Sequence, residues 1–148
     1  MVEQAGSVLP NETGGVLLGY WLQAGVEVVI TAMVGPGPRA RHRRTTFCPD
    51  YDFQEHEIAR HYAESGRRTE YLGDWHSHPK GGVGLSRKDR RTLAAIATYA
   101  EARAPTPLMA ILAGRPRWHF AVWCTEPPNR VLWTGRLIVN QVRIKTFG

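Results

Sequence analysis

The chain has 148 residues, of which 43% are apolar and 22% are charged, and its mean hydropathy is −0.33. A chain of this size and composition can bury a core of its own, which excludes collagen-like, coiled-coil and disordered proteins and predicts one domain over residues 1–148. No apolar run approaches the roughly 20 residues of a membrane helix, and the N-terminus lacks the pattern of a signal peptide. We therefore expect a cytoplasmic protein without a membrane partner.

Nineteen Lys and Arg residues against thirteen Asp and Glu residues give a formal net charge of +6. This excess favours an acidic partner. The basic residues do not alternate with aromatic ones as in nucleic-acid-binding modules, so we do not expect nucleic acid. Cys48 and Cys124 lie far apart and form no CxxC pair, which predicts two buried, reduced thiols rather than a thiolate metal site.

The first half of the chain predicts a hairpin, a loop and a helix. Residues 14–22 and 26–34 are rich in β-branched and aromatic residues with turn residues between them, which is typical of an antiparallel hairpin. Residues 35–44, GPGPRARHRR, combine Pro and Gly with a basic run and predict an exposed loop whose arginines could bind an acidic protein surface. Residues 50–65 have helical spacing, and Gly66 can end that helix.

The second half predicts strands around one further helix. Residues 69–76 favour a strand, and an apolar stripe predicts a helix from Ser86 to Arg103, with Pro105 as its stop. Three more strands are expected over residues 108–113, 118–124 and 131–144. The expected fold class is mixed α/β, with a largely antiparallel sheet flanked by helices.

Two histidines and a carboxylate carry the strongest chemical signal. His76 and His78 are two residues apart, so on a strand their imidazoles project from the same face and can converge on one ion. Asp89 follows eleven residues later, in the first turn of the second helix. Two imidazoles and one carboxylate form the three-ligand set of a catalytic zinc site that leaves the fourth position to water.

Each fragment also has a simpler interpretation. A His-x-His pair on a strand is often just two hydrogen-bonded histidines, and Ser86-x-x-Asp89 fits a helix capping box. A carboxylate folded back onto the cap is not expected to be free for zinc. His56 and His61 suggest the HExxH motif, but they are five residues apart, about 140° around a helix, whereas that motif needs four. We therefore expect these two on a polar helix face.

Taken together, the segments resemble the JAMM signature H-[ST]-H-x7-S-x2-D of the JAB1/MPN/Mov34 metalloproteases. His76-Ser77-His78, Ser86 and Asp89 match its spacing. The family also carries a glutamate before its first strand, and Glu12, in NETGGVLLG, is similar to that element of prokaryotic JAB proteins. The resemblance implies a JAB/MPN fold, which is cytidine-deaminase-like.

The resemblance also implies roles for individual residues. His76, His78 and Asp89 would hold one zinc ion with a catalytic water, Glu12 would be the general base, and Ser86 would donate a hydrogen bond to the oxyanion. Among their neighbours, Asp74 and Ser77 could orient the imidazoles. Asp74, which has the same strand parity as His76, is equally compatible with a solvated residue at a strand edge. Trp75 has the opposite strand parity to His76 and is expected in the core.

The implied activity is that of a zinc metallopeptidase, an isopeptidase that cleaves at the C-terminus of a ubiquitin-like modifier or its conjugate. The sequence is most similar to deconjugating peptidases of bacterial anti-phage systems of the CBASS type, which implies E1- and E2-like enzymes as possible partners. The substrate tail is expected to lie along an exposed strand edge near the site. Two alternatives stay open: amino-acid release from a sulfur-carrier protein by the same zinc site, and a non-catalytic module that binds protein or nucleic acid.

Overall fold

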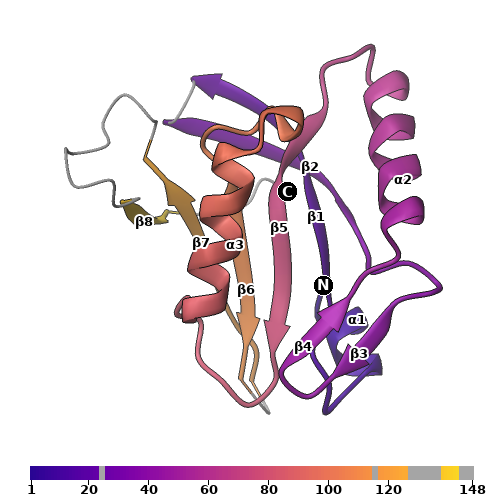
Figure 1. The fold of residues 1–148 in the computed structure, drawn as a ribbon, viewed down its shortest axis with the longest axis vertical. Coiled ribbons are helices and arrows are strands. Elements are labelled where there is room, and N and C mark those ends of the chain that lie inside the picture. Colours follow the sequence, from indigo (N-terminus) through magenta and orange to yellow (C-terminus); the bar gives the residue numbers. More distant parts are fainter. Residues whose placement is uncertain (24–25, 115–116, 127–137, 144–148) are drawn as a thin grey trace.

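The computed structural model describes residues 1–23, 26–114, 117–126 and 138–143. Within them, a six-stranded sheet has the order β2-β1-β5-β6-β7-β8, and two further strands form a separate hairpin (Figure 1). The strands are β1 (Gly14–Gln23), β2 (Glu27–Val34), β3 (Arg41–Arg43), β4 (Thr46–Cys48), β5 (Glu70–His78), β6 (Leu108–Ala113), β7 (His119–Thr125) and β8 (Val139–Val142). The helices are α1 (Val2–Ser7), α2 (Tyr51–Glu64), α3 (Arg87–Thr98) and the short 3-10 helix η1 (Ala100–Ala102).

This architecture confirms the expected mixed α/β fold. In the six-stranded sheet β5 and β6 pair in parallel, and every other described pair is antiparallel. The opening hairpin corresponds to β1 and β2, although residues 24–25 of its turn lie outside the described residues. Of the strand expected over residues 131–144, only β8 is described as a strand, and residues 131–137 and 144 lie outside the described part.

Several boundaries differ from the sequence prediction, and β5, for example, runs to His78 rather than ending at His76. The basic segment expected to be a loop contains β3, which pairs with β4 through Arg41↔Cys48 and Arg43↔Thr46. The helix expected to run to Arg103 ends at Thr98, because the chain turns into extended geometry at Tyr99. The Thr98 hydroxyl donates to the carbonyls of Ala94 and Ala95, a local bond of the kind that weakens helix continuation.

Helix α2 begins and ends as its sequence predicts. The Asp50 carboxylate accepts a hydrogen bond from the Phe53 backbone N–H and so caps the first turn. Gly66 follows the end of the helix with a φ of 66°, a left-handed conformation that glycine adopts without steric cost. In the described part of the chain, no helix has the length and apolar character needed to cross a membrane.

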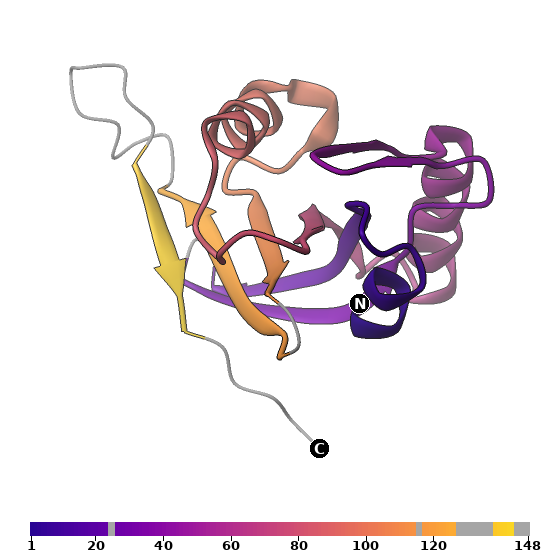
Figure 2. The same ribbon diagram turned by 90° about the horizontal axis from the view of Figure 1, so that it is seen from below.

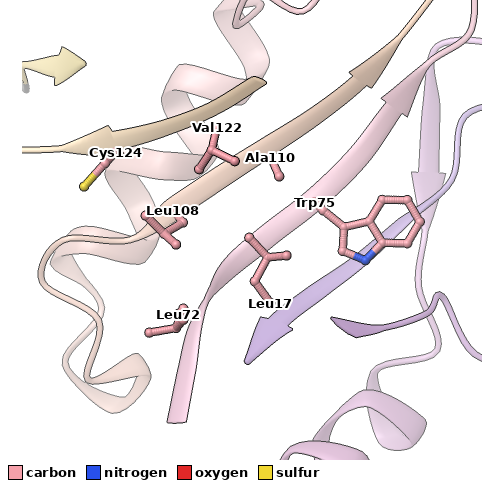
Figure 3. Packing of buried hydrophobic residues seen from close by; sticks show 7 residues of the cluster. All are labelled: Leu17, Leu72, Trp75, Leu108, Ala110, Val122 and Cys124. Atoms are coloured by element: carbon pink, nitrogen blue, oxygen red, sulfur yellow. The ribbon is translucent and has the colours of Figure 1, made fainter. Parts of the chain in front are cut away.

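One face of the sheet carries the largest apolar cluster. Seven residues from β1, β5, β6 and β7 pack there (Figure 3), namely Leu17, Leu72, Trp75, Leu108, Ala110, Val122 and Cys124. Trp75 is fully buried, and its indole N–H donates to the Val34 carbonyl at 3.1 Å. The expected core position of Trp75 is thereby confirmed, and the tryptophan ties β5 to β2 across β1.

The opposite face of the sheet is covered by α2 and α3, which lie on the same side of it as the β3–β4 hairpin (Figure 2). Leu93 of α3 packs on Met109 and Ile111 of β6. Val16 and Leu18 of β1 form a second cluster with Phe53 and Ile58 of α2 around them as partly buried neighbours. The C-terminal end of β5 emerges beside the N-terminus of α3 and the β3–β4 hairpin (Figure 1).

Candidate metal centre

His76 and His78 end strand β5 on the face that the helices cover. Because side chains alternate along a strand, the two imidazoles lie opposite Trp75 and Ser77. His76 is 9% exposed, and its Nε2 lies 2.9 Å from Nε2 of His78. The strand therefore brings two ring nitrogens together at its end.

Asp89 reaches the same point from the first turn of α3. Its Oδ1 lies 3.1 Å from Nε2 of His76, and its Oδ2 lies 3.5 Å from Nε2 of His78. Among the described residues, these three side chains form the one group of His, Cys, Asp and Glu residues close enough to share an ion, with donor atoms all within 4.8 Å of one another.

The capping box of α3 is also formed, and it involves the same carboxylate. The Ser86 N–H donates to Asp89 Oδ2 at 2.7 Å, and the Asp89 N–H donates to Ser86 Oγ at 3.1 Å. The sequence analysis expected a capping carboxylate not to be free for an ion. The cap bond from the Ser86 N–H uses only Oδ2, and a carboxylate has two oxygens and about four lone-pair sites. Here Oδ2 closes the cap while Oδ1 faces His76.

The hydrogen bonds of His78 fix which nitrogen is available. Its Nδ1 lies 3.0 Å from the Gly82 carbonyl, which can only accept, so Nδ1 carries the proton. In the neutral ring Nε2 then presents a lone pair toward His76 and Asp89. Zinc with ligands at about 2.0–2.1 Å in a tetrahedron would hold neighbouring ligand atoms about 3.3 Å apart. The 2.9 Å between the two Nε2 atoms and the 3.1 Å from His76 Nε2 to Asp89 Oδ1 are close to that spacing.

The electrostatics of Asp89 also suit a ligand. Burial alone would raise the pKa of its carboxyl group, but the hydrogen bond and charge of His76 and the hydrogen bonds of Ser86 hold the pKa well below its usual range. The carboxylate is therefore ionised at neutral pH, as a metal ligand must be.

Glu12 approaches from the N-terminal side of β1. Its backbone N–H donates to the Arg43 carbonyl at 2.8 Å, and its carbonyl is 3.0 Å from Nδ1 of His42. Burial raises the pKa of the Glu12 carboxyl group, the charges of His78 and His76 lower it, and that of Asp89 raises it, for a net upward shift. The carboxyl group thus lies within the electric field of all three candidate ligands.

A reciprocal contact fixes Glu12 relative to β5. The Thr13 N–H donates to Ser77 Oγ at 3.0 Å, and the Ser77 N–H donates to the Thr13 carbonyl at 2.7 Å. The next residue, Gly14, pairs with His76, and a Cβ there would clash with the Trp75 carbonyl and the Phe47 ring. The small residue allows β1 to run this close to the histidines.

The two expected orienting residues have other contacts. Ser77 projects away from the imidazoles, on the Trp75 face, and bonds to Thr13. Asp74 shares the His76 face, but its Oδ1 accepts from the Tyr71 hydroxyl at 2.7 Å, and burial raises the pKa of its carboxyl group. The prediction that they hold the rings is not supported by these hydrogen bonds. Ser77 instead positions the segment that carries Glu12.

The sequence analysis missed the β3–β4 hairpin as a neighbour of the centre. His42 and Phe47 stack with ring centroids 6.5 Å apart, and Phe47 lies against Gly14. Lys88, next to Asp89, donates from Nζ to Thr46 Oγ1 at 2.7 Å. The basic run in the sequence was the available signal, but it did not reveal a strand.

The remaining candidate ligands lie elsewhere. His56 is exposed on α2, and His61 contacts Arg60 through Nε2 at 3.2 Å. Cys124 is buried, and burial raises the pKa of its thiol to about 11. Both cysteines are free, but Cys48 is only half-buried, which corrects the expectation that both thiols are buried.

Residues 1–134 match the family described as prokaryotic homologs of the JAB domain. The chain is 42% identical over 138 residues to a "Probable metalloprotease y4qB" of Sinorhizobium fredii, covering 92% of this chain and 84% of that protein. It is 28% identical over 120 residues to a "CD-NTase/cGAS isopeptidase" of Enterobacter hormaechei, covering 80% of this chain and 64% of that protein.

A solved structure has the same fold. The solution structure of a protein from Desulfitobacterium hafniense superimposes with a TM-score of 0.65 at 18% identity and covers 98% of this chain and 84% of its own. The sequence relatives support a metallopeptidase role, whereas the structural likeness bears on the fold alone.

Proposed function

Because the chain belongs to the family of prokaryotic JAB homologues, we propose that it is a zinc-dependent isopeptidase that cleaves at the C-terminus of a ubiquitin-like modifier. The proposal rests above all on one observation. The donor atoms of His76, His78 and Asp89 lie within 4.8 Å of one another, and the Glu12 carboxyl group is close enough for the charges of all three to act on its pKa. The relatives named metalloprotease and isopeptidase support the same class of chemistry.

The metal ligands in this proposal are Nε2 of His76, Nε2 of His78 and Oδ1 of Asp89. The hydrogen bond from His78 Nδ1 to the Gly82 carbonyl fixes the ring tautomer that such a ligand needs. When bound, zinc supplies Lewis acidity, which polarises the scissile carbonyl and makes water more acidic.

Glu12 is the general base. It takes the proton of the attacking water and later gives it to the leaving amine. Its raised pKa makes the carboxylate a better proton acceptor than an exposed glutamate. The backbone bonds at Glu12 and Thr13 hold it in place before substrate arrives.

Ser86 is the oxyanion donor. Its Oγ accepts the Asp89 N–H at 3.1 Å, which holds the hydroxyl at the N-terminus of α3 beside the candidate ligands. The side chain is exposed, so a substrate carbonyl can reach it. Loss of one such donor lowers kcat by about 100- to 1,000-fold in enzymes of comparable chemistry.

The substrate class follows from the more distant relative and the family resemblance. That relative is named for isopeptidase activity on a CD-NTase, an activity that presupposes a protein attached through its C-terminus. An extended tail can add as a strand to the β3–β4 hairpin, a two-stranded sheet beside the centre. E1- and E2-like enzymes would supply the conjugate. A sulfur-carrier protein has the same kind of tail, and the test below includes it as the alternative substrate.

The test uses fusions of candidate ubiquitin-like and sulfur-carrier proteins, each with a short C-terminal extension, read by intact mass. We expect one of them to be cut after its terminal glycine by zinc-loaded protein, and a chelator to abolish the cut. Glu12→Gln should keep the zinc and lose the cleavage, because it removes the base but no ligand, whereas the control Glu55→Gln, on the exposed face of α2, should cleave normally.

Full cleavage in the presence of chelator, or by Glu12→Gln, would overturn the mechanism. Release of a single amino acid from a sulfur carrier, with no cut in any ubiquitin-like fusion, would replace the substrate assignment while keeping the site.

A further inference from the structure

The β3–β4 hairpin presents two arginines on one face. The pairs Arg41↔Cys48 and Arg43↔Thr46 put these four side chains on the same side of the two-stranded sheet. The four, with Phe47, line a pocket of about 160 Å³. Both guanidinium groups belong to exposed residues, so this face of the hairpin is open to a ligand.

Helix α3 places a third cation next to this pocket. Lys88 donates from Nζ to Thr46, which is one of the pocket residues. The backbone carbonyl of Arg43 accepts a hydrogen bond from the N–H of Glu12, the candidate base. Lys88 directly precedes Asp89, a candidate ligand. The three cations therefore belong to segments that directly adjoin the candidate base and ligands. The hairpin that carries the two arginines lies beside the end of β5 in both views (Figures 1 and 2).

These cations have no ion-pair partner among the described residues, although Lys88 lies close enough to Glu12 for its charge to lower the pKa of that carboxyl group. Arg39, on the same loop, is paired with Asp50 and Asp52, and Arg60 is paired within α2. No described carboxylate forms an ion pair with Arg41, Arg43 or Lys88. Like charges gathered at one surface repel one another, and an anionic partner removes that cost.

We infer that Arg41, Arg43 and Lys88 bind acidic residues of the polypeptide substrate close to the bond that is cut, so that the site prefers an acidic tail to a basic one. This inference rests on the proposed function, because that function places the cleaved bond at the metal centre. A divalent ion in the centre would add to the positive field and strengthen the same preference. A protein ligand is favoured over nucleic acid because the one aromatic residue of the pocket, Phe47, packs against Gly14 and offers no stacking platform.

The test measures binding rather than turnover. Fluorescein-labelled peptides that end in Gly-Gly-Lys after three Glu, three Gln or three Lys residues are titrated with the zinc-loaded Glu12→Ala protein, at low and high salt, and read by anisotropy. We expect the Glu peptide to bind most tightly, and its affinity to fall as the salt concentration rises. In the double variant Arg41→Gln/Arg43→Gln its affinity should fall roughly two- to thirtyfold, the range for the loss of two exposed ion pairs.

Two further variants control for folding and for net charge. Lys88→Gln should lower the affinity for the Glu peptide without altering the hairpin strands. Arg67→Gln removes one positive charge, as Lys88→Gln does, but at a position beyond the end of α2, and it should leave the affinity unchanged. Equal binding of the three peptides, no measurable binding, or an unchanged affinity in both pocket variants would overturn the inference.

A single-stranded oligonucleotide is the competing probe. If it bound more tightly than the Glu peptide and lost affinity in the double variant, the cations would serve nucleic acid instead. If no modifier fusion were cut but the three peptides bound in the expected order, the peptidase assignment would fail, whereas the binding of acidic polypeptides by these cations would still be supported. Equal cleavage of acidic and basic tails would overturn this inference alone.

Discussion

Asp89 divides its carboxylate between two tasks, with Oδ1 3.1 Å from Nε2 of His76 and Oδ2 bonded to the Ser86 N–H that begins helix α3. The helix cap and the candidate metal ligand are therefore the same side chain. Because the cap fixes the orientation of the carboxylate, folding of α3 would preorganise the proposed metal centre.

Substitution should separate the two tasks. In Asp89→Asn the amide keeps one oxygen, which can cap α3, but it loses the charge that a divalent ligand needs. We expect it to lose zinc on dialysis, and its metal-free form to melt below the wild type, because the ionised carboxylate that His76 and Ser86 stabilise is replaced by a neutral amide. Ser86→Ala, the matched change, should lower the free energy of unfolding by about 1 kcal/mol and keep the zinc.

Metal analysis and urea unfolding on both variants check this prediction. The shared-carboxylate account fails if Asp89→Asn retains zinc as tightly as the wild type.

The contact between Thr13 and Ser77 gives a second prediction. Ser77→Ala would leave the buried Thr13 N–H without a partner, at a cost of about 1–3 kcal/mol, and would loosen the segment that holds Glu12. We expect lower kcat with unchanged zinc content. Thr13→Val is the control, since the Thr13 hydroxyl is buried without a partner among the described residues and its removal should not destabilise the protein.

Unfolding curves and kcat are to be measured for both variants. A stable, fully active Ser77→Ala would show that this contact does not position the base.

The pH dependence of stability should reflect Asp50. The hydrogen bond from Arg39 lowers the pKa of its carboxyl group in the folded protein, aided by the Phe53 and Arg39 backbone N–H groups. The unfolded chain, with an ordinary pKa near 3.9, takes up a proton first as the pH falls. The stabilisation is therefore complete above about pH 5 and is lost as the pH falls through 3.9 toward the folded value.

Asp50→Asn should lower stability at pH 7 and flatten its decline between pH 5 and 3. Asp52→Asn, whose side chain is 82% exposed and contacts the same arginine, should change the profile little. Thermal melting across this pH range decides the point, and equal acid sensitivity of wild type and Asp50→Asn would refute it.

Local patterns predicted much of this molecule. The His-x-His alternation, the capping residues and the apolar stripe of α3 are signals between near neighbours, and strand and helix geometry converts them directly into positions. The parity of Trp75 predicted its burial in the same way. The fold class followed from the order of such elements.

Other features depend on partners far away in the chain. Ser77 bonds to Thr13, 64 residues earlier, and alternation gives the face of a side chain but not its partner. The strands β3 and β4 have three residues each, too few for a period to emerge from a basic run. The sequence did not show that Asp89 Oδ2 can close the cap while Oδ1 faces His76, because a sequence motif assigns one role to a residue, whereas a carboxylate has two oxygens.

The central claim is that His76, His78 and Asp89 hold one zinc ion, and native mass spectrometry of zinc-loaded protein tests it most directly. The account predicts one zinc per chain, lost in His76→Ala and His78→Ala but retained in His56→Ala and His61→Ala. Zinc that stays on the first pair of variants and leaves the second, or a wild-type chain that takes up none, would contradict it.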